Sequence, residues 1–205
     1  MLAEMDIKEF LEKTASNDPV PGGGSVAALS SGLASALTAM VANLTKDKEK
    51  YKEYKEEMED IVDRLCVRKN EFLQLIDKDA NSFDSVIKAY KMPKETEKQK
   101  KLRKEAIQDG MKYAAKVPLG IAIDGSKLFE DIELVVRHGN ENAVTDGLVA
   151  AMLTRTSIKS ALLNVKINLD SINDEEFVQE MSAQVKELED FADKREKEIL
   201  KLSKF

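Results

Sequence analysis

A long uncharged segment near the N-terminus most constrains what this chain can fold into. Residues Val26 to Leu44 contain no Asp, Glu, Lys or Arg and are rich in Ala, Ser and Gly. The segment is close to the length of a membrane span, roughly 20 residues. It contains Asn43, however, and no aromatic residue anchors its ends. We therefore interpret residues Ser25 to Leu44 as a helix that is apolar on nearly all sides and buried in a protein core, and we expect no contact with a membrane.

Periodic apolar residues predict that the rest of the chain is helical as well. Residues 6–14 read as a short amphipathic helix, with Asp6 and Glu9 as its capping box. Apolar side chains then recur at three- and four-residue steps from Lys48 to about Tyr90, and Pro93 ends this pattern. We expect the remaining helices at residues 93–116, 118–138 and 142–169, and after a cap at Asn173.

No alternating pattern typical of β-strands competes with these helices. We therefore predict an all-α fold, with residues 1–205 forming a single-domain bundle of long antiparallel helices. One cysteine and one histidine, Cys66 and His138, cannot build a disulfide framework or a zinc site of several Cys and His ligands. The net charge of −6 argues against nucleic acid as a partner. The first residues lack the features of a secretion signal, so we expect a cytoplasmic protein.

A glycine-rich turn precedes the long apolar helix. Its residues are Pro21, Gly22, Gly23, Gly24 and Ser25. Successive glycines permit positive φ and let other groups approach the backbone closely, and the N–H groups at a helix N-terminus bind anions. The turn lacks the Lys-Ser/Thr ending of a nucleotide-binding P-loop. It is either a ligand-binding loop or a tight turn in which Ser25 caps the helix.

The segment from Pro19 to Thr45, PVPGGGSVAALSSGLASALTAMVANLT, resembles the signature of the formimidoyltetrahydrofolate cyclodeaminase and methenyltetrahydrofolate cyclohydrolase family. Further motifs agree in family order: Tyr51 after a lysine-rich turn, Asp79 to Asp84 before Tyr90, Val117 to Leu119, Gly139 to Asn142 with Asp146, and Asn164 to Leu169. One departure is Arg155 between two threonines, where the family is expected to have smaller, more apolar residues. If that helix lines the site, Arg155 could alter substrate preference.

The resemblance implies a homodimer that binds a tetrahydrofolate derivative in a cleft near the glycine-rich turn. Such enzymes either close 5-formimidoyl-tetrahydrofolate to 5,10-methenyl-tetrahydrofolate and release ammonia, or open the methenyl ring with water to give 10-formyl-tetrahydrofolate. Both reactions need a positioned base and acid, and neither needs a metal or an external cofactor. The absence of a formiminotransferase domain favours the cyclohydrolase. The alternative is a non-catalytic helical module that binds folate or a protein partner.

The candidate acids and bases are Asp146, Asp79 and His138. Asp146 lies in an otherwise apolar helical stretch, so its carboxylate is either functional or paired in a cap or an interface. Asp79 is either catalytic or a solvated surface carboxylate. His138, at the predicted end of a helix, either transfers protons or places a favourable charge there.

The candidate substrate-binding residues outside the glycine-rich turn are polar side chains near helix ends: Asn43, Lys46, Asn140, Asn142 and Asn164. The amides could instead cap helices or bridge them, and Lys46 could serve only the helix C-terminus. The basic run from Lys94 to Lys104 either holds the polyglutamate tail of a natural folate or is a solvated helix face.

Overall fold

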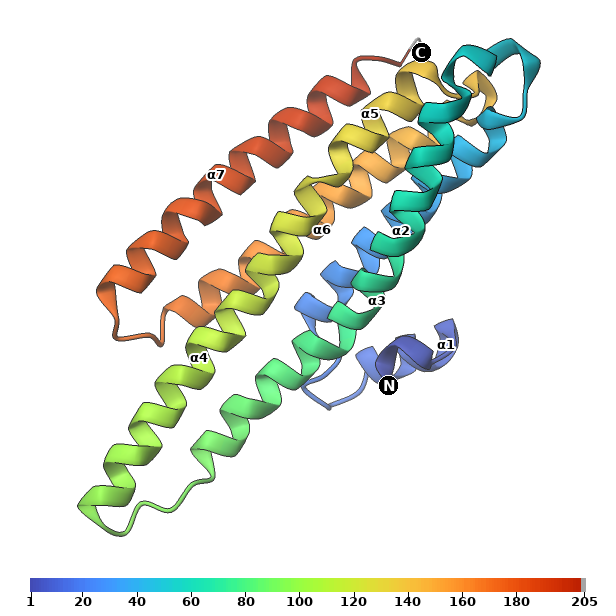
Figure 1. Ribbon diagram of the computed structural model, residues 1–205. Coiled ribbons are helices and arrows are strands. Elements are labelled where there is room, and N and C mark those ends of the chain that lie inside the picture. Colours follow the sequence, from blue (N-terminus) through green and yellow to red (C-terminus); the bar gives the residue numbers. More distant parts are fainter. Residues whose placement is uncertain (204–205) are drawn as a thin grey trace.

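The structure is a computed structural model that describes residues 1–203. Its elements in chain order are η1 (Leu2–Glu4), α1 (Ile7–Thr14), α2 (Gly23–Lys46), η2 (Glu49–Tyr54), α3 (Lys55–Tyr90), α4 (Glu97–Ser126), α5 (Leu128–His138), η3 (Glu141–Ala143), α6 (Val144–Leu169) and α7 (Glu175–Leu200), where η marks a 3-10 helix. These residues contain no β-strand. The predicted all-α class is therefore confirmed (Figure 1).

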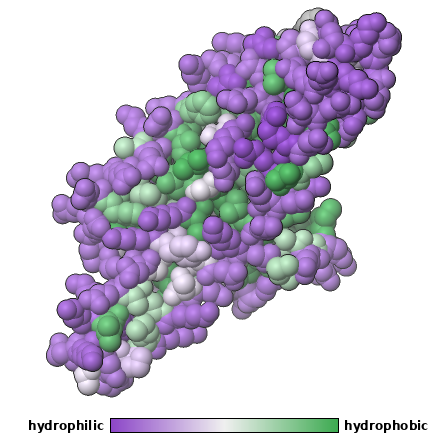
Figure 2. Space-filling view, viewed as in Figure 1, coloured by the Kyte–Doolittle hydropathy of each residue, from purple (hydrophilic) through white to green (hydrophobic). Residues whose placement is uncertain are grey.

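The long helices run side by side as a bundle around α2 (Figure 1). α2 packs against α3 on one side and α6 on another, and α4 completes the bundle between α3 and α6. α7 covers α6, and α1 stands apart beside the first turns of α2. In the view of Figure 2, polar and charged side chains cover the outward faces of these helices, and apolar side chains show mainly in the furrows between them.

α2 is only partly the buried helix that its sequence predicts. By length and composition it is apolar enough to cross a membrane, and 56% of its most apolar window is buried inside the bundle. One side is open, however, because Val26, Leu33, Met40 and Leu44 are 37–50% exposed. These side chains recur at steps of seven, seven and four residues and form one stripe along the helix. The expectation of burial on nearly all sides was therefore wrong for this stripe.

One predicted helix boundary was wrong because a residue of another helix supplies the missing hydrogen bond. Pro118 does not start a helix but lies inside α4, which continues through it to Ser126. A proline at this place cannot donate a hydrogen bond to the carbonyl group of Ala114, four residues earlier. Asn168 of α6 satisfies that carbonyl instead, with its Nδ2 donating to the Ala114 oxygen at 2.9 Å.

The start of α7 also differs from the prediction. Asp174, not Asn173, is its N-cap, because the Asp174 carboxylate accepts a hydrogen bond from the Phe177 N–H at 3.1 Å. Lys112 of α4 holds the same carboxylate at 2.6 Å. This ion pair and the cap together keep the pKa of Asp174 below its usual range. An ionised aspartate suits a helix N-terminus better than the neutral amide of Asn173.

We expect replacement of Asn168 by Ala to lower the free energy of unfolding by about 1–3 kcal/mol, because it leaves the buried Ala114 carbonyl unpaired. The second substitution Pro118→Ala supplies an N–H to that carbonyl, so Asn168→Ala should cost less in a Pro118→Ala background. A double-mutant cycle from urea denaturation measures this coupling. If Asn168→Ala lowers the free energy of unfolding equally in the two backgrounds, Asn168 does not compensate for the N–H that Pro118 lacks.

Candidate functional site

The N-terminus of α2 is capped by a side chain from another helix. Gly22, its N-cap residue, has no side chain to offer, and Ser25 lies inside the helix instead of capping it. Asp79 of α3 takes this role: its Oδ2 lies 3.1 Å from the Ser25 hydroxyl, and the carboxylate also accepts from the Ser25 backbone N–H. The Ser25 hydroxyl also donates to the Ile76 carbonyl at 3.0 Å. The anion expected at this helix end is therefore a carboxylate of the protein itself.

Burial determines how the Asp79 carboxyl ionises. Removal from water penalises the charged form and raises the pKa of Asp79, and the hydrogen bonds from Ser25 oppose this shift only in part. Asp79 was predicted to be either catalytic or a solvated surface carboxylate. Its partial burial and its contacts with α2 show that it is not a solvated surface group.

The glycines are needed for close approach, and positive φ plays no part. No glycine among residues 1–203 has a positive φ. A Cβ atom on Gly24 would overlap the carboxylate of Asp79, and one on Gly23 would lie 2.9 Å from Nδ2 of Asn164. These glycines thus let α3 and α6 bring a carboxylate and an amide against the first turn of α2. Asn164 donates its Nδ2 to the Ser160 carbonyl at 2.8 Å.

The C-terminus of α2 is also held by a residue from elsewhere in the chain. Asn140 donates its Nδ2 to the Leu44 carbonyl at 3.2 Å and its backbone N–H to the Thr45 hydroxyl at 2.8 Å. Its Oδ1 accepts from the Asn142 N–H at 3.2 Å. Asn140 is 5% exposed. Between capping and substrate binding, the contacts in this structure therefore favour capping for Asn140.

Three other predicted residues lie near this end of α2 with polar side chains still available. Asn43 is exposed, Lys46 is half-buried in the last turn of α2, and Asp146 is half-buried in the first turn of α6. Among residues 1–203, none of these side chains makes a hydrogen bond or an ion pair. Such groups can meet a ligand or a second protein without first breaking a bond within the chain.

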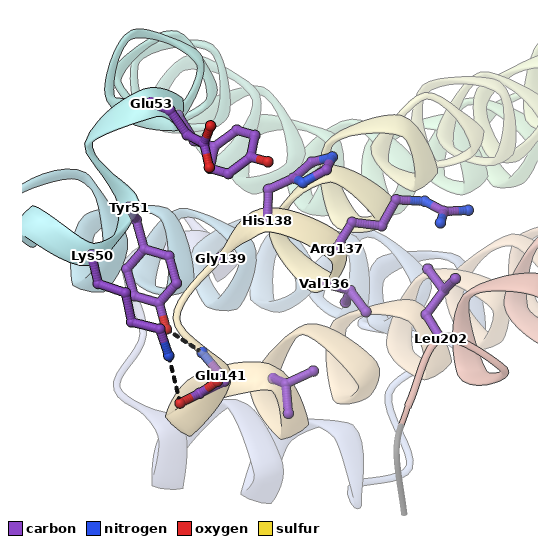
Figure 3. Close-up of a pocket in the computed structure, with 11 residues that line it drawn as sticks. Lys50, Tyr51, Glu53, Val136, Arg137, His138, Gly139, Glu141 and Leu202 are labelled. Atoms are coloured by element: carbon purple, nitrogen blue, oxygen red, sulfur yellow. Dashed lines mark hydrogen bonds and ion pairs between the residues drawn. The ribbon is translucent and has the colours of Figure 1, made fainter.

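His138 lines a separate pocket of about 630 Å³ at the same end of the bundle (Figure 3). Its ring stacks on Tyr54, with centroids 4.4 Å apart. On the other side of the pocket Lys50 pairs with Glu141 at 2.7 Å, and the Glu141 N–H donates to the Tyr51 hydroxyl at 3.2 Å. No pattern in the sequence predicts this aromatic stack, because it brings together residues more than 80 positions apart.

The predicted site residues therefore form two groups at opposite ends of α2. Gly22 to Ser25, Asp79 and Asn164 lie at its start, whereas Asn43, Lys46, His138, Asn140, Asn142 and Asp146 lie near its end. Because α2 has 24 residues, the groups are separated by about 36 Å at 1.5 Å per residue. A single chain does not bring both groups to one substrate.

Arg155 has a role that its sequence context did not indicate. Its Nε lies 2.8 Å from Asp193 and 3.4 Å from Glu196, both on α7. Lys159, one turn further along α6, also pairs with Asp193, at 2.7 Å. Arg155 thus joins α6 to α7, away from the residues that surround the start of α2.

We expect Gly24→Ala to destabilise the fold by about 1–3 kcal/mol, since the new methyl group would force apart α2 and Asp79. Gly120 provides a matched control, because a Cβ there meets nothing within 4 Å. Gly120→Ala, in the interior of α4, should stabilise by about 0.5–1 kcal/mol through helix propensity. Thermal and urea unfolding measure both changes. Equal effects of the two substitutions would contradict the close-approach interpretation.

Comparisons with known proteins agree with this arrangement of helices. Residues 6–187 match the family described as formiminotransferase-cyclodeaminase. A methenyltetrahydrofolate cyclohydrolase from Methylorubrum extorquens is 34% identical over 92% of this chain and 89% of its own length. The formimidoyltransferase-cyclodeaminase of Gallus gallus is 32% identical over 87% of this chain, which spans about a third (33%) of that relative. The crystal structure of formiminotetrahydrofolate cyclodeaminase from Thermotoga maritima superposes with a TM-score of 0.88 at 32% identity, covering 98% of this chain and 97% of that one.

Proposed function

This chain belongs to the formiminotransferase-cyclodeaminase family and is a folate one-carbon enzyme, and we propose that its reaction is the hydrolysis of 5,10-methenyl-tetrahydrofolate to 10-formyl-tetrahydrofolate. The support is the cyclohydrolase of Methylorubrum extorquens, which matches along most of both chains. Cyclodeamination of 5-formimidoyl-tetrahydrofolate is the second candidate, since the Thermotoga maritima relative with the same fold is named for it. Both reactions proceed through a tetrahedral carbon between N5 and N10 of the folate.

We further propose that the enzyme acts as a homodimer, formed through an apolar face on α2 and α6. The open stripe of α2 lies beside a similar stripe on α6, where Val149, Met152, Leu163 and Ile167 are 44–67% exposed. We call these two stripes the α2–α6 face. Two adjacent apolar stripes of this length on one side of a molecule are typical of a surface that a partner covers.

A two-fold axis across the α2–α6 face would bring the two groups of predicted site residues together, one group from each subunit. In a two-fold pair with the α2 helices antiparallel, the start of α2 in one subunit lies beside the end of α2 in the other. Asp146 and Asn164 are 18 residues apart on α6, which is five full turns, so they share one side of that helix about 27 Å apart. The pairing thus brings Asp146 of the partner subunit toward Asn164 and Asp79.

The proposed hydrolysis needs the two carboxylates in different roles. One removes a proton from water as its oxygen bonds to the methenyl carbon. The carbon–N5 bond then breaks and N5 gains a proton. The hydroxyl group that water left on this carbon loses its proton and becomes the carbonyl of the formyl group, so the overall reaction releases one proton. We assign the proton-holding role to Asp79, because burial raises its pKa and favours the protonated form. Asp146 of the partner subunit is the second carboxylate. No metal or cofactor is required.

Lys94 to Lys104 is a candidate surface for the polyglutamate tail of natural folates. It spans the turn between α3 and α4 and the first turns of α4, and it begins fifteen residues after Asp79, just beyond the end of α3. Some of its charges already have partners, as in the 2.7 Å pair of Lys100 with Glu97. Lys98 and Lys104 have none among residues 1–203 and are the ones we propose for the tail.

The substrate assignment is tested by offering the wild-type enzyme methenyl- and formimidoyl-tetrahydrofolate under identical conditions and comparing kcat/KM from the absorbance of the methenyl form. We expect the higher value with methenyl-tetrahydrofolate. A higher value with the formimidoyl substrate would identify a cyclodeaminase, and binding of folinate with no turnover of either would identify a binding module. Polyglutamylated methenyl-tetrahydrofolate should show a lower KM, and the difference should disappear in Lys98→Ala/Lys104→Ala.

The two carboxylates are tested by Asp79→Asn and Asp146→Asn. Loss of a general acid or base should lower kcat by about 10²–10⁴-fold, with circular dichroism spectra unchanged. Asp84→Asn is the control, because Asp84 is an exposed carboxylate five residues beyond Asp79 on the same helix. Equal activity of all three variants would contradict the assignment.

Mixing the two inactive variants tests whether subunits share a site. A heterodimer of Asp79→Asn and Asp146→Asn has one site with both substitutions and one with neither. Random exchange of subunits should therefore restore about a quarter of wild-type activity. No recovery after exchange, shown by mass-tagged subunits, would place both carboxylates of each site in one chain.

A further inference from the structure

Residues 1–14 form an arm with an open apolar groove beneath it. η1 is fixed to α3, because the N–H groups of Leu2 and Ala3 donate to the Asp77 carboxylate at 2.7 and 3.4 Å. Phe10, 8% exposed, anchors α1. A groove of about 390 Å³ remains between this arm and the bundle. Leu2, Ala3, Met5, Ile7, Phe10, Leu11, Thr14, Val26, Leu29, Leu73 and Ile76 line it.

Packing of α1 on its own bundle does not account for the apolar side chains that the groove leaves exposed. Ile7 is 82% exposed and Leu11 is 62% exposed, although both are large apolar residues of a helix whose ends are well defined. Figure 2 shows apolar side chains gathered on the side of the molecule where α1 lies in Figure 1. α1 thus presents apolar side chains on two sides, and only the side with Phe10 is covered by its own bundle.

The apolar lining of the groove favours a protein as its ligand. Of the residues that line it, only Thr14 has a polar side chain, and its hydroxyl already donates to the Phe10 carbonyl at 2.7 Å. Sites for small ligands normally add a few polar groups that fix orientation. A lipid surface is disfavoured too, since residues 4–18 contain five acidic and two basic side chains, and anionic lipids repel such a segment.

We propose that the groove receives apolar side chains of a second copy of this chain, so that residues 1–14 act as an arm that clasps the partner subunit. The inference rests on the homodimer proposed above. Val26 belongs both to the groove and to the open stripe of α2, so the groove continues the α2–α6 face without a break. In the antiparallel pair, Leu44 of the partner subunit approaches this end of α2.

The arm would also position the glycine-rich turn. Residues 15–22 join α1 to α2, and this connection is restrained by the 2.7 Å ion pair of Lys13 with Asp18. A partner that holds α1 in place therefore limits the movement of Gly22 to Gly24 beside Asp79. The residues of the arm are positioning residues, since they touch no reacting atom.

The test replaces Ile7 and Leu11 by Asp, singly and together, and measures the dimer dissociation constant by sedimentation equilibrium. We expect it to rise at least about tenfold for each substitution, because an apolar side chain loses its burial and a charge takes its place. KM for the folate should rise as the glycine-rich turn loosens. Val67→Asp is the control: Val67 is 59% exposed on α3, outside the groove and the α2–α6 face, and its replacement should change neither constant.

Leu33→Asp, in the centre of the proposed face, separates failure of the arm from failure of the dimer. If Leu33→Asp dissociates the dimer and Ile7→Asp and Leu11→Asp do not, the proposed contact of residues 1–14 with the partner subunit is wrong, and the dimer through the α2–α6 face is supported. A wild-type chain that sediments as a monomer while hydrolysing methenyl-tetrahydrofolate would overturn the arm and the shared site together, and leave the proposed reaction intact.

Discussion

The two ends of α2 depend on side chains that other helices supply, and the rest of the structure is arranged around this dependence. At its N-terminus the Ser25 N–H and hydroxyl meet the Asp79 carboxylate of α3, and the Leu44 carbonyl at the other end meets the amide of Asn140. A helix rich in Ala, Ser and Gly has little side-chain bulk to fix its position. These polar contacts at its ends, together with the buried hydrogen bonds of Ser157 on α6 to Ser31 and to the Ala27 carbonyl, therefore help to fix where it lies between α3 and α6.

The all-α class could be predicted from the sequence because apolar periodicity is a local property of each segment. The importance of the glycine-rich turn could also be predicted, but its reason could not. Positive φ is a property of one residue, whereas the contact that Gly24 permits is with Asp79, more than 50 residues away. Pro118 shows the same limit, since the Asn168 amide that allows α4 to continue belongs to another helix.

The candidate site was predicted as a set of residues, and the structure divides that set between the two ends of a helix. The order of the motifs along the sequence does not reveal this division. Asp79 and Asp146 belong to motifs of the same family, and nothing in the sequence says that these motifs lie at opposite ends of α2. The open stripes of α2 and α6 are hidden in the sequence for a related reason. Their apolar residues look the same whether the chain's own core or a second chain covers them. The proposed site between two subunits explains both observations: the site residues lie at opposite ends of α2, and the α2–α6 face is exposed in a single chain.

The proposed hydrolysis gives Asp79 a chemical role beside its structural one, and the two would conflict in most positions. A carboxylate that caps a helix is usually stabilised in its charged form, which makes it a poor proton donor. Here burial outweighs the hydrogen bonds from Ser25 and raises the pKa of Asp79, so the carboxyl group stays fixed in place yet is easier to protonate than a solvated one. A group already held by Ser25 in the space that Gly24 leaves needs no rearrangement when charge develops on the substrate, and that preorganisation is what an enzyme gains over water.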